Sequence, residues 1–142
     1  MKYNKTIGCV SIHIDTKRID ENVRRAQDAL DQQVLNDMIP YMPFQQGAMV
    51  DATHIIEPGL IATNTPYAHY QYMGDVYGPN IPIRNDDGII TGWWSPPNKT
   101  KTERKLQYDK TFNPEATDHW FEHAKQAHGQ EWVDLVKREI GK

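Results

Sequence analysis

The sequence predicts an α+β fold built as a single domain over residues 1–142. Apolar residues alternate with more polar ones over residues 8–14, which is the period of a strand with one buried face. Apolar residues then recur every three or four positions after residue 15 and again after residue 119, which is the period of amphipathic helices. A chain of 142 residues also has the length of one ordinary domain.

The first strand and the first helix are the clearest elements. We expect the strand to be half-buried, and Asp15 or Thr16 can cap the helix that follows it. Pro40 and Pro43 should end this helix, because proline lacks the amide hydrogen and clashes with the preceding turn. The apolar positions of the strand are Val10, Ile12 and Ile14, and those of the helix are Ile19, Val23, Ala26, Leu30, Val34 and Met38.

The middle of the chain predicts a hairpin and a short helix. Two apolar runs, residues 48–56 and 60–64, flank the turn sequence Glu57-Pro58-Gly59 and should pair as antiparallel strands. Thr65-Pro66 then opens a short helix that runs to Tyr72 and ends at Gly74.

Residues 75–112 are predicted to form one long loop or hairpin that belongs to the domain and projects from its core. The segment is rich in proline and glycine and has no sustained period. Within it, residues 81–83 and 89–94 flank Asn85-Asp86-Asp87-Gly88, and Asp-Gly favours the tight turn of a projecting hairpin. A segment of this length without regular structure is usually functional or disordered.

The C-terminal helix is expected to begin at Asn113-Pro114-Glu115, because proline is favoured at the first helical position. One stripe of this helix should be buried. It consists of Trp120, Phe121, Ala124, Trp132 and Leu135.

Composition excludes several classes of protein. A net charge of -3, from 16 Lys+Arg and 19 Asp+Glu, is too balanced for a chain that coats DNA with a basic surface. Cys9, the single cysteine, cannot form an internal disulfide and lacks the partners of a zinc knuckle. No apolar run approaches the ~18 residues that cross a bilayer, and we expect no signal peptide. The chain is therefore expected to be soluble and made in a reducing cytoplasm.

The sharpest enzymatic signal is His119-Trp120-Phe121-Glu122-His123, which matches the H-x-x-E-H pattern of inverted zinc peptidases. In that pattern two histidines bind zinc and the glutamate activates water. At about 100° per residue, both histidines fall outside the buried stripe, toward solvent. Further ligands downstream would have to come from Glu131 or Glu139 on the same helix. A solvated histidine pair is favoured, and a zinc-binding hydrolase stays as the alternative function.

The other candidate groups are weaker. The cluster of Tyr67, His69, Tyr70 and Tyr72 could hold an acid or base. We favour the interpretation that alternate rings pack under the sheet while the others form a solvated contact surface. Asp86-Asp87 occupies a turn without the further oxygen ligands of a metal loop. The chain lacks a phosphate-binding glycine loop and a nucleophile elbow. We therefore predict no enzyme, and no catalytic, cofactor-binding or metal-binding residue.

Residues 93–105 instead favour contacts with other proteins. Trp93 and Trp94 precede Ser95-Pro96-Pro97, which places two large rings on a stiff segment, and tryptophan is enriched at interfaces. The alternative is that both rings cover the domain's own sheet.

A basic cluster follows the tryptophan pair. It could pair with the acidic first helix of another copy and join copies head-to-tail in a ring. It could instead stay solvated, or line a DNA channel through phosphate contacts alone. The basic residues are Lys99, Lys101, Arg104 and Lys105, and the acidic ones are Asp20, Glu21, Asp28 and Asp31.

Three segments follow one another along the chain: residues 39–49, residues 67–74 with their tyrosines and final glycine, and the C-terminal helix with Trp120-Phe121 and Trp132. In this order they resemble the minor capsid proteins of tailed bacteriophages, of the head–tail connector type found in the neck or at tail completion. The likeness runs from about residue 8 to residue 137. The chain departs from the family at Gln45-Gln46-Gly47, where an Asp-Thr-Gly-like turn is common, and in the length of residues 75–112.

The resemblance implies a non-enzymatic virion protein without a cofactor, in which a small antiparallel sheet is packed by the long N-terminal helix and the C-terminal helix. It implies a homo-oligomeric ring in the neck, assembled in the host cytoplasm, between portal-side neck proteins and the tail terminator or tail tube. Genome DNA would pass through this ring without sequence-specific binding, and no membrane would be involved. Alternatives are the zinc hydrolase and a binding module unrelated to phages.

Overall fold

The computed structural model of the protein describes residues 2–44 and 46–142, so Gln45 of the Gln45-Gln46-Gly47 turn lies outside the described residues. The α+β class is confirmed. In chain order the elements are β1 (Lys2–Ile7), β2 (Val10–Asp15), α1 (Lys17–Met38), η1 (Ile39–Tyr41), α2 (Ala48–Asp51), β3 (Thr53–Glu57), β4 (Leu60–Thr63), α3 (Ala68–Met73), β5 (Asp75–Gly78), β6 (Ile81–Arg84), β7 (Ile90–Trp94), β8 (Thr100–Lys105) and α4 (Trp120–Ile140).

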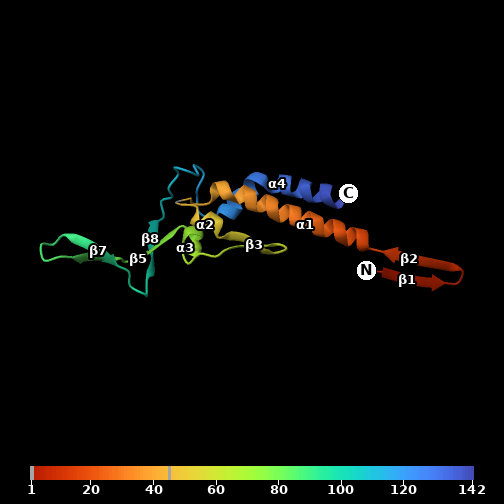
Figure 1. Cartoon of the computed structure of the whole chain (residues 1–142), viewed down its shortest axis with the longest axis horizontal. Helices are drawn as coiled ribbons and strands as arrows, with labels where there is room; N and C mark the ends of the chain where they lie inside the picture. The colour runs from red at the N-terminus through yellow and green to blue at the C-terminus, as the bar shows by residue number, and fades with distance from the viewer. Residues whose placement is uncertain (1, 45) are drawn as a thin grey trace.

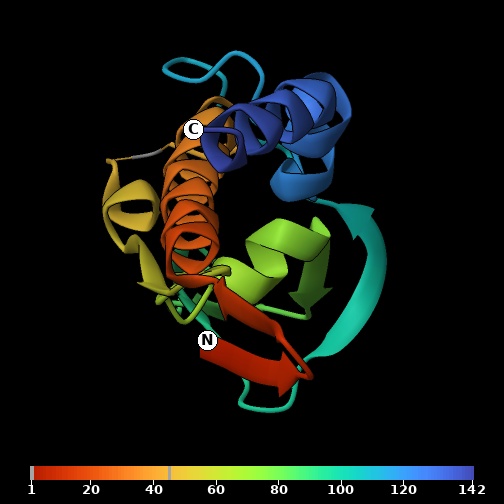
Figure 2. The same cartoon turned by 90° about the vertical axis from the view of Figure 1, so that its right-hand side faces the viewer.

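The described chain is elongated, with a helical body between two projecting β-hairpins (Figure 1). The β1–β2 hairpin continues outward from the N-terminal end of α1, and the β6–β7 hairpin extends from the opposite end of the body. Figure 2 looks along this long axis, with α1 and α4 side by side behind the β1–β2 hairpin. None of the described helices is long and apolar enough to cross a membrane.

The core lies where α1 and α4 pack antiparallel. At one end the side-chain amide of Asn22 donates a hydrogen bond of 3.0 Å to the carbonyl of Ile140. At the other end the indole of Trp132 bonds to Asp37. The buried core cluster consists of Val34, Met38, Met42, Met49, Trp120, Ala124 and Trp132. The predicted stripe of the C-terminal helix is thus buried at three positions, whereas Phe121 is exposed and Leu135 is half-buried.

The strands form four separate two-stranded antiparallel ribbons in place of one sheet, paired as β1–β2, β3–β4, β5–β8 and β6–β7. The β3–β4 ribbon lies against α1, because the Asp31 carboxylate accepts a hydrogen bond of 2.9 Å from the backbone amide of Gly59 in the turn of that ribbon. The family resemblance implied strands packed against the helices, and in this chain the β3–β4 ribbon packs in this way.

Three predictions about local structure hold. Lys17–Met38 is one helix preceded by Thr16. It ends before Pro40, which lies in the 3-10 helix η1 that follows. The short helix α3 ends at Gly74, whose φ of 68° is the left-handed conformation that favours glycine. The β6–β7 hairpin turns at Asn85–Gly88, where Gly88 also has a positive φ of 77°.

The prediction of a half-buried first strand is wrong in two ways. Gly8 and Cys9 form the turn of a hairpin, so residues 2–7 are a further strand that the alternation after Gly8 did not predict. All twelve residues of the two strands are exposed. The reason is that the hairpin projects beyond the body and finds no described surface to pack on (Figure 1). For the same reason Ile19 and Val23, at the adjoining end of α1, are exposed.

Two element boundaries also differ from prediction. Residues 48–51 are helical, and the Asp51 amide bonds to the carbonyl of Gly47 at 2.8 Å. The C-terminal helix begins at Trp120, because tertiary hydrogen bonds hold residues 113–118 outside a helix. Here the Asn113 side-chain amide donates to the carbonyls of Ile39 and Met42, each at 2.9 Å.

Candidate functional site

Residues 75–105 form one long ribbon, which we call the distal ribbon; β5 and β8 are its base and β6 and β7 its tip. The chain enters the ribbon at Gly74 and returns at Leu106, whose amide donates a hydrogen bond of 3.0 Å to the Gly74 carbonyl. A Cβ atom at position 74 would lie 2.9 Å from Cβ of Asp118. Glycine is thus required here by both conformation and space, and it fixes where the ribbon leaves the body.

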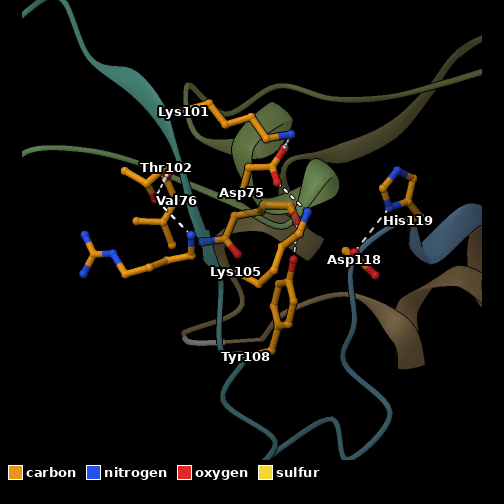
Figure 3. Close-up of polar contacts among 10 residues, drawn as sticks. Asp75, Val76, Lys101, Thr102, Lys105, Tyr108, Asp118 and His119 are labelled. Carbon is orange, nitrogen blue, oxygen red and sulfur yellow. Dashed lines mark hydrogen bonds and ion pairs between the residues drawn. The ribbon is translucent and has the colours of Figure 1, made fainter.

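The base of the distal ribbon is held by a buried carboxylate. The Asp75 side chain is 4% exposed, and Nζ of Lys101 lies 2.7 Å from Oδ2 while Nζ of Lys105 lies 2.6 Å from Oδ1. Figure 3 shows both lysines reaching from β8 to this carboxylate. The hydrogen bonds from Lys101 and Lys105 hold the pKa of Asp75 below its ordinary value, and Asp75 in turn raises the pKa of Lys101.

This arrangement separates the four basic residues that the sequence predicted as partner contacts. Lys101 and Lys105 are engaged within the chain at the ribbon base. Within the described residues, the side chains of Lys99 and Arg104 form no ion pair. Asp75 neutralises one of the two charges of Lys101 and Lys105, whereas neither charge of the second pair is neutralised by an ion pair in the described chain.

The tip of the distal ribbon is apolar and open. Trp93 and Trp94 are 61% and 53% exposed, so neither ring covers the body of the domain. Their register partners are Pro82 and Ile81, and neighbouring residues of a strand point to opposite faces, so the two indoles lie on opposite faces of the ribbon. Further exposed aliphatic residues of the tip are Ile81, Ile83, Ile89 and Ile90.

The N-terminal hairpin, β1–β2, is a second open surface and has two unlike faces. Residues directly opposite each other in an antiparallel pair share a face. The register therefore gives one mainly apolar face, made of Tyr3, Lys5, Ile7, Val10, Ile12 and Ile14. The opposite face is polar and is made of Lys2, Asn4, Thr6, Ser11, His13 and Asp15. The apolar side chains of the first face are 42% to 60% exposed. The sequence signal for this surface is that every second residue on both sides of Gly8-Cys9 belongs to this mainly apolar face.

A groove of about 590 Å³ lies in the body between α1, β4, α3 and α4. Its floor contains the buried Asp31 carboxylate, which was expected to be part of an acidic helix surface. The structure contradicts that expectation, because Asp31 accepts hydrogen bonds from Gln27 and Gly59 inside the fold. Apolar lining residues include Leu30, Val34, Met38, Leu60, Tyr72 and Phe121.

The H-x-x-E-H motif is spread over the start of α4. His119 precedes the helix in the left-handed conformation, with φ of 43°, and its Nδ1 faces Asp118 at 3.5 Å. Glu122 accepts a hydrogen bond from the Tyr72 hydroxyl, and His123 is exposed and stacks on the ring of Tyr41. Among residues 2–44 and 46–142, no three His, Cys, Asp or Glu side chains are grouped to hold a metal ion.

The tyrosine cluster divides as expected between core and surface. Tyr72 packs edge-on against Trp120 at 4.7 Å, and burial with the Glu122 hydrogen bond raises the pKa of Tyr72 above its ordinary value. Tyr67 and Tyr70 are exposed, and Asp86-Asp87 lies in the exposed turn of the ribbon tip.

Comparison with known proteins identifies the family. No curated protein and no solved structure matches the chain. The sequence model of a family described as "Minor capsid protein" matches residues 10–140. That match runs from the start of β2 to the end of α4 and includes the distal ribbon. The chain therefore belongs to this family of bacteriophage minor capsid proteins and is a structural protein of the virion.

Proposed function

We propose that this minor capsid protein is a neck subunit, which forms a ring around the DNA channel and joins the portal side of the capsid to the tail. The observation that carries the proposal is the placement of two exposed apolar hairpins at opposite ends of one helical body (Figure 1). A ring subunit that joins head and tail must contact other molecules on more than one side, and this chain exposes apolar surface at both ends.

The composition of both ends supports protein contacts. Interfaces concentrate their binding energy in a few large apolar side chains, above all tryptophan and tyrosine. The distal ribbon carries Trp93 and Trp94, and the N-terminal hairpin carries Tyr3 among its aliphatic residues. Within the described residues, each two-stranded ribbon pairs with no further strand, so its outer strand edges are open to pairing. These features fit surfaces that become covered on assembly.

The charge of the chain supports a channel through which DNA slides. Neutralising many phosphates requires many unpaired lysines and arginines. Here the net charge is -3, and Lys101 and Lys105 of the basic cluster are already paired with Asp75. We therefore propose that DNA passes without being bound in a sequence-specific manner. For the hydrolase alternative, Glu122 would have to leave Tyr72 before it could activate water.

A phage with an early stop codon in the gene for this chain tests the proposal. Electron microscopy of the lysate should show DNA-filled heads and complete tails that are not joined, and a plasmid copy of the wild-type chain should restore joined particles. Particle images of tagged wild-type virions should place the tag between head and tail. A tag on the capsid shell or at the distal end of the tail contradicts the neck assignment.

A further inference from the structure

The apolar face of the N-terminal hairpin has no cover within the described chain. Five of its six residues are apolar and at least 42% exposed. A two-stranded hairpin by itself is marginally stable in water, and it gains stability when its apolar face packs on another surface. The regular register of β1 and β2 over six residue pairs is thus expected to depend on such a surface.

The hairpin does not occupy the groove of its own body. The groove contacts α1 between Gln27 and Met38, whereas the hairpin departs from the other end of α1, before Lys17, and points away from the body (Figure 1). At about 1.5 Å per residue, the ten helical steps from Lys17 to Gln27 place the near edge of the groove roughly 15 Å from the start of α1. In this arrangement the groove stays open to the hairpin of another molecule.

The groove and the hairpin face are complementary in charge as well as polarity. Asp31, 6% exposed, lies in the groove with hydrogen bonds from Gln27 and Gly59, and no cation pairs with it among the described residues. Lys5 is the one charged residue of the hairpin's apolar face, and it too has no ion partner in the described chain. A buried carboxylate without a cation is costly and is stabilised by an approaching ammonium group.

We propose that the apolar face of the β1–β2 hairpin docks into the groove of a second copy of this chain, with Lys5 beside Asp31 of that copy. Hairpin and groove are different surfaces, so the contact is head-to-tail and repeats from copy to copy, closing into a ring when the rotation allows. This inference rests on the proposed ring and specifies which surfaces build it. It also explains why an apolar strand pattern is exposed in the single chain.

Cys9, at the exposed turn of the hairpin, provides a direct test because it is the chain's single cysteine. Tagged wild-type chain is mixed with untagged Cys9→Ser, Leu60→Cys chain, so that a short bismaleimide can join position 9 to position 60 only between copies. Leu60 lines the groove and is exposed, so it tolerates substitution. The matched control replaces Leu60→Cys by Lys125→Cys, on an exposed position of α4 outside the groove.

We expect a cross-linked tagged–untagged dimer with Leu60→Cys, at least tenfold more abundant than with Lys125→Cys, in the purified chain or in virions that carry both copies. Equal yields from the two variants in both settings overturn the proposal. So does a cross-link from position 9 to a different virion protein, or an efficient cross-link within one chain when Leu60→Cys is combined with the native Cys9.

A charge reversal on either face of the hairpin tests the orientation. Lys5→Glu, on the apolar face, should lower the yield of the Leu60→Cys cross-link at least tenfold, because it places a second carboxylate beside Asp31. Lys2→Glu makes the same change of charge on the polar face and should leave the yield within twofold. Equal effects of the two substitutions mean that the apolar face is not the docked one.

The hairpin contact and the neck function can be contradicted independently of each other. If virions with Lys5→Glu still join heads to tails and the cross-link is absent in wild type, the hairpin contact is wrong while the neck function stands. If the cross-link forms but tagged protein lies elsewhere in the virion, the contact stands and the neck function is wrong.

Discussion

Nε1 of Trp132 on α4 donates a hydrogen bond of 2.7 Å to Oδ2 of Asp37 on α1. The indole is buried among the core residues, and the same carboxylate accepts hydrogen bonds of 3.0 and 3.1 Å from Gln33. One polar contact thus positions the two long helices against each other, because a buried indole N–H without an acceptor is unfavourable.

Trp132→Phe should therefore destabilise the chain by about 1–3 kcal/mol, since it removes a hydrogen bond to a charged group and leaves a small cavity. Urea unfolding followed by circular dichroism measures this change. Trp93→Phe, at an exposed position, is the control and should stay within about 0.5 kcal/mol of wild type. Equal stability of the two variants would show that the bond to Asp37 contributes nothing.

The double substitution Trp93→Ala, Trp94→Ala should leave unfolding cooperative and nearly unchanged, because both rings are mostly exposed. It should reduce the fraction of joined particles when it replaces wild type in the complementation assay. Trp120→Ala, at a buried tryptophan, is the contrast and should cost about 3–5 kcal/mol. Loss of the cooperative transition in the double variant would place these rings in the core.

Acid should weaken the base of the distal ribbon through Asp75. Its folded-state pKa is lowered, first by the hydrogen bonds from Lys101 and Lys105, so the carboxyl stabilises the fold above its unfolded pKa of about 3.9. That contribution is lost as the pH falls through the lower folded pKa. Urea unfolding at pH steps between about 5 and 2 should show a steeper loss in wild type than in Asp75→Asn. Parallel curves would contradict the assignment.

The two pairs of basic residues, Lys101 with Lys105 and Lys99 with Arg104, should behave differently. Lys101→Ala, Lys105→Ala leaves the buried Asp75 without cations and should destabilise the ribbon, seen as faster proteolysis between residues 75 and 105. Lys99→Ala, Arg104→Ala removes the unpaired charges and should leave proteolysis unchanged while lowering assembly. If the second pair alters proteolysis as strongly as the first, its charges serve the fold and are not partner contacts.

The histidines of the H-x-x-E-H motif should be dispensable for phage infectivity. His119→Gly suits the left-handed backbone at that position, and His123→Ala removes an exposed ring. We expect the double variant to give wild-type titres. Stoichiometric zinc in the purified parent chain, with loss of both zinc and infectivity in the variant, would instead establish the hydrolase or metalloprotein alternative.

Much of the local structure was predictable, because it depends on neighbours in sequence. The period of Ile19 to Met38 specifies a helix, Gly74 ends α3, and Asp87-Gly88 turns the β6–β7 hairpin. Position 113 shows the limit of such reasoning. Asn113-Pro114-Glu115 is a favourable sequence for the start of a helix. The Asn113 side chain, however, donates hydrogen bonds to carbonyls more than seventy positions away, and the helix begins only at Trp120.

The candidate contact residues show the same division. The sequence identified Trp93-Trp94 and the prolines that follow as a candidate contact but left open whether the rings cover the domain, and the structure shows both rings exposed. The internal use of Lys101, Lys105 and Asp31 could not be anticipated, because their partners Asp75 and Gly59 are brought near only by the folded chain.

The sequence by itself determined the α+β class, the long helix, the projecting hairpin within residues 81–94 and the resemblance to phage minor capsid proteins, whereas the pairing of β5 with β8 was not predicted. Tertiary structure alone decided which apolar faces are covered. An alternating pattern specifies that Val10, Ile12 and Ile14 share one face of a strand, but it does not specify what packs on that face. Because the hairpin extends past the body, this face stays open in the single chain and available to another molecule.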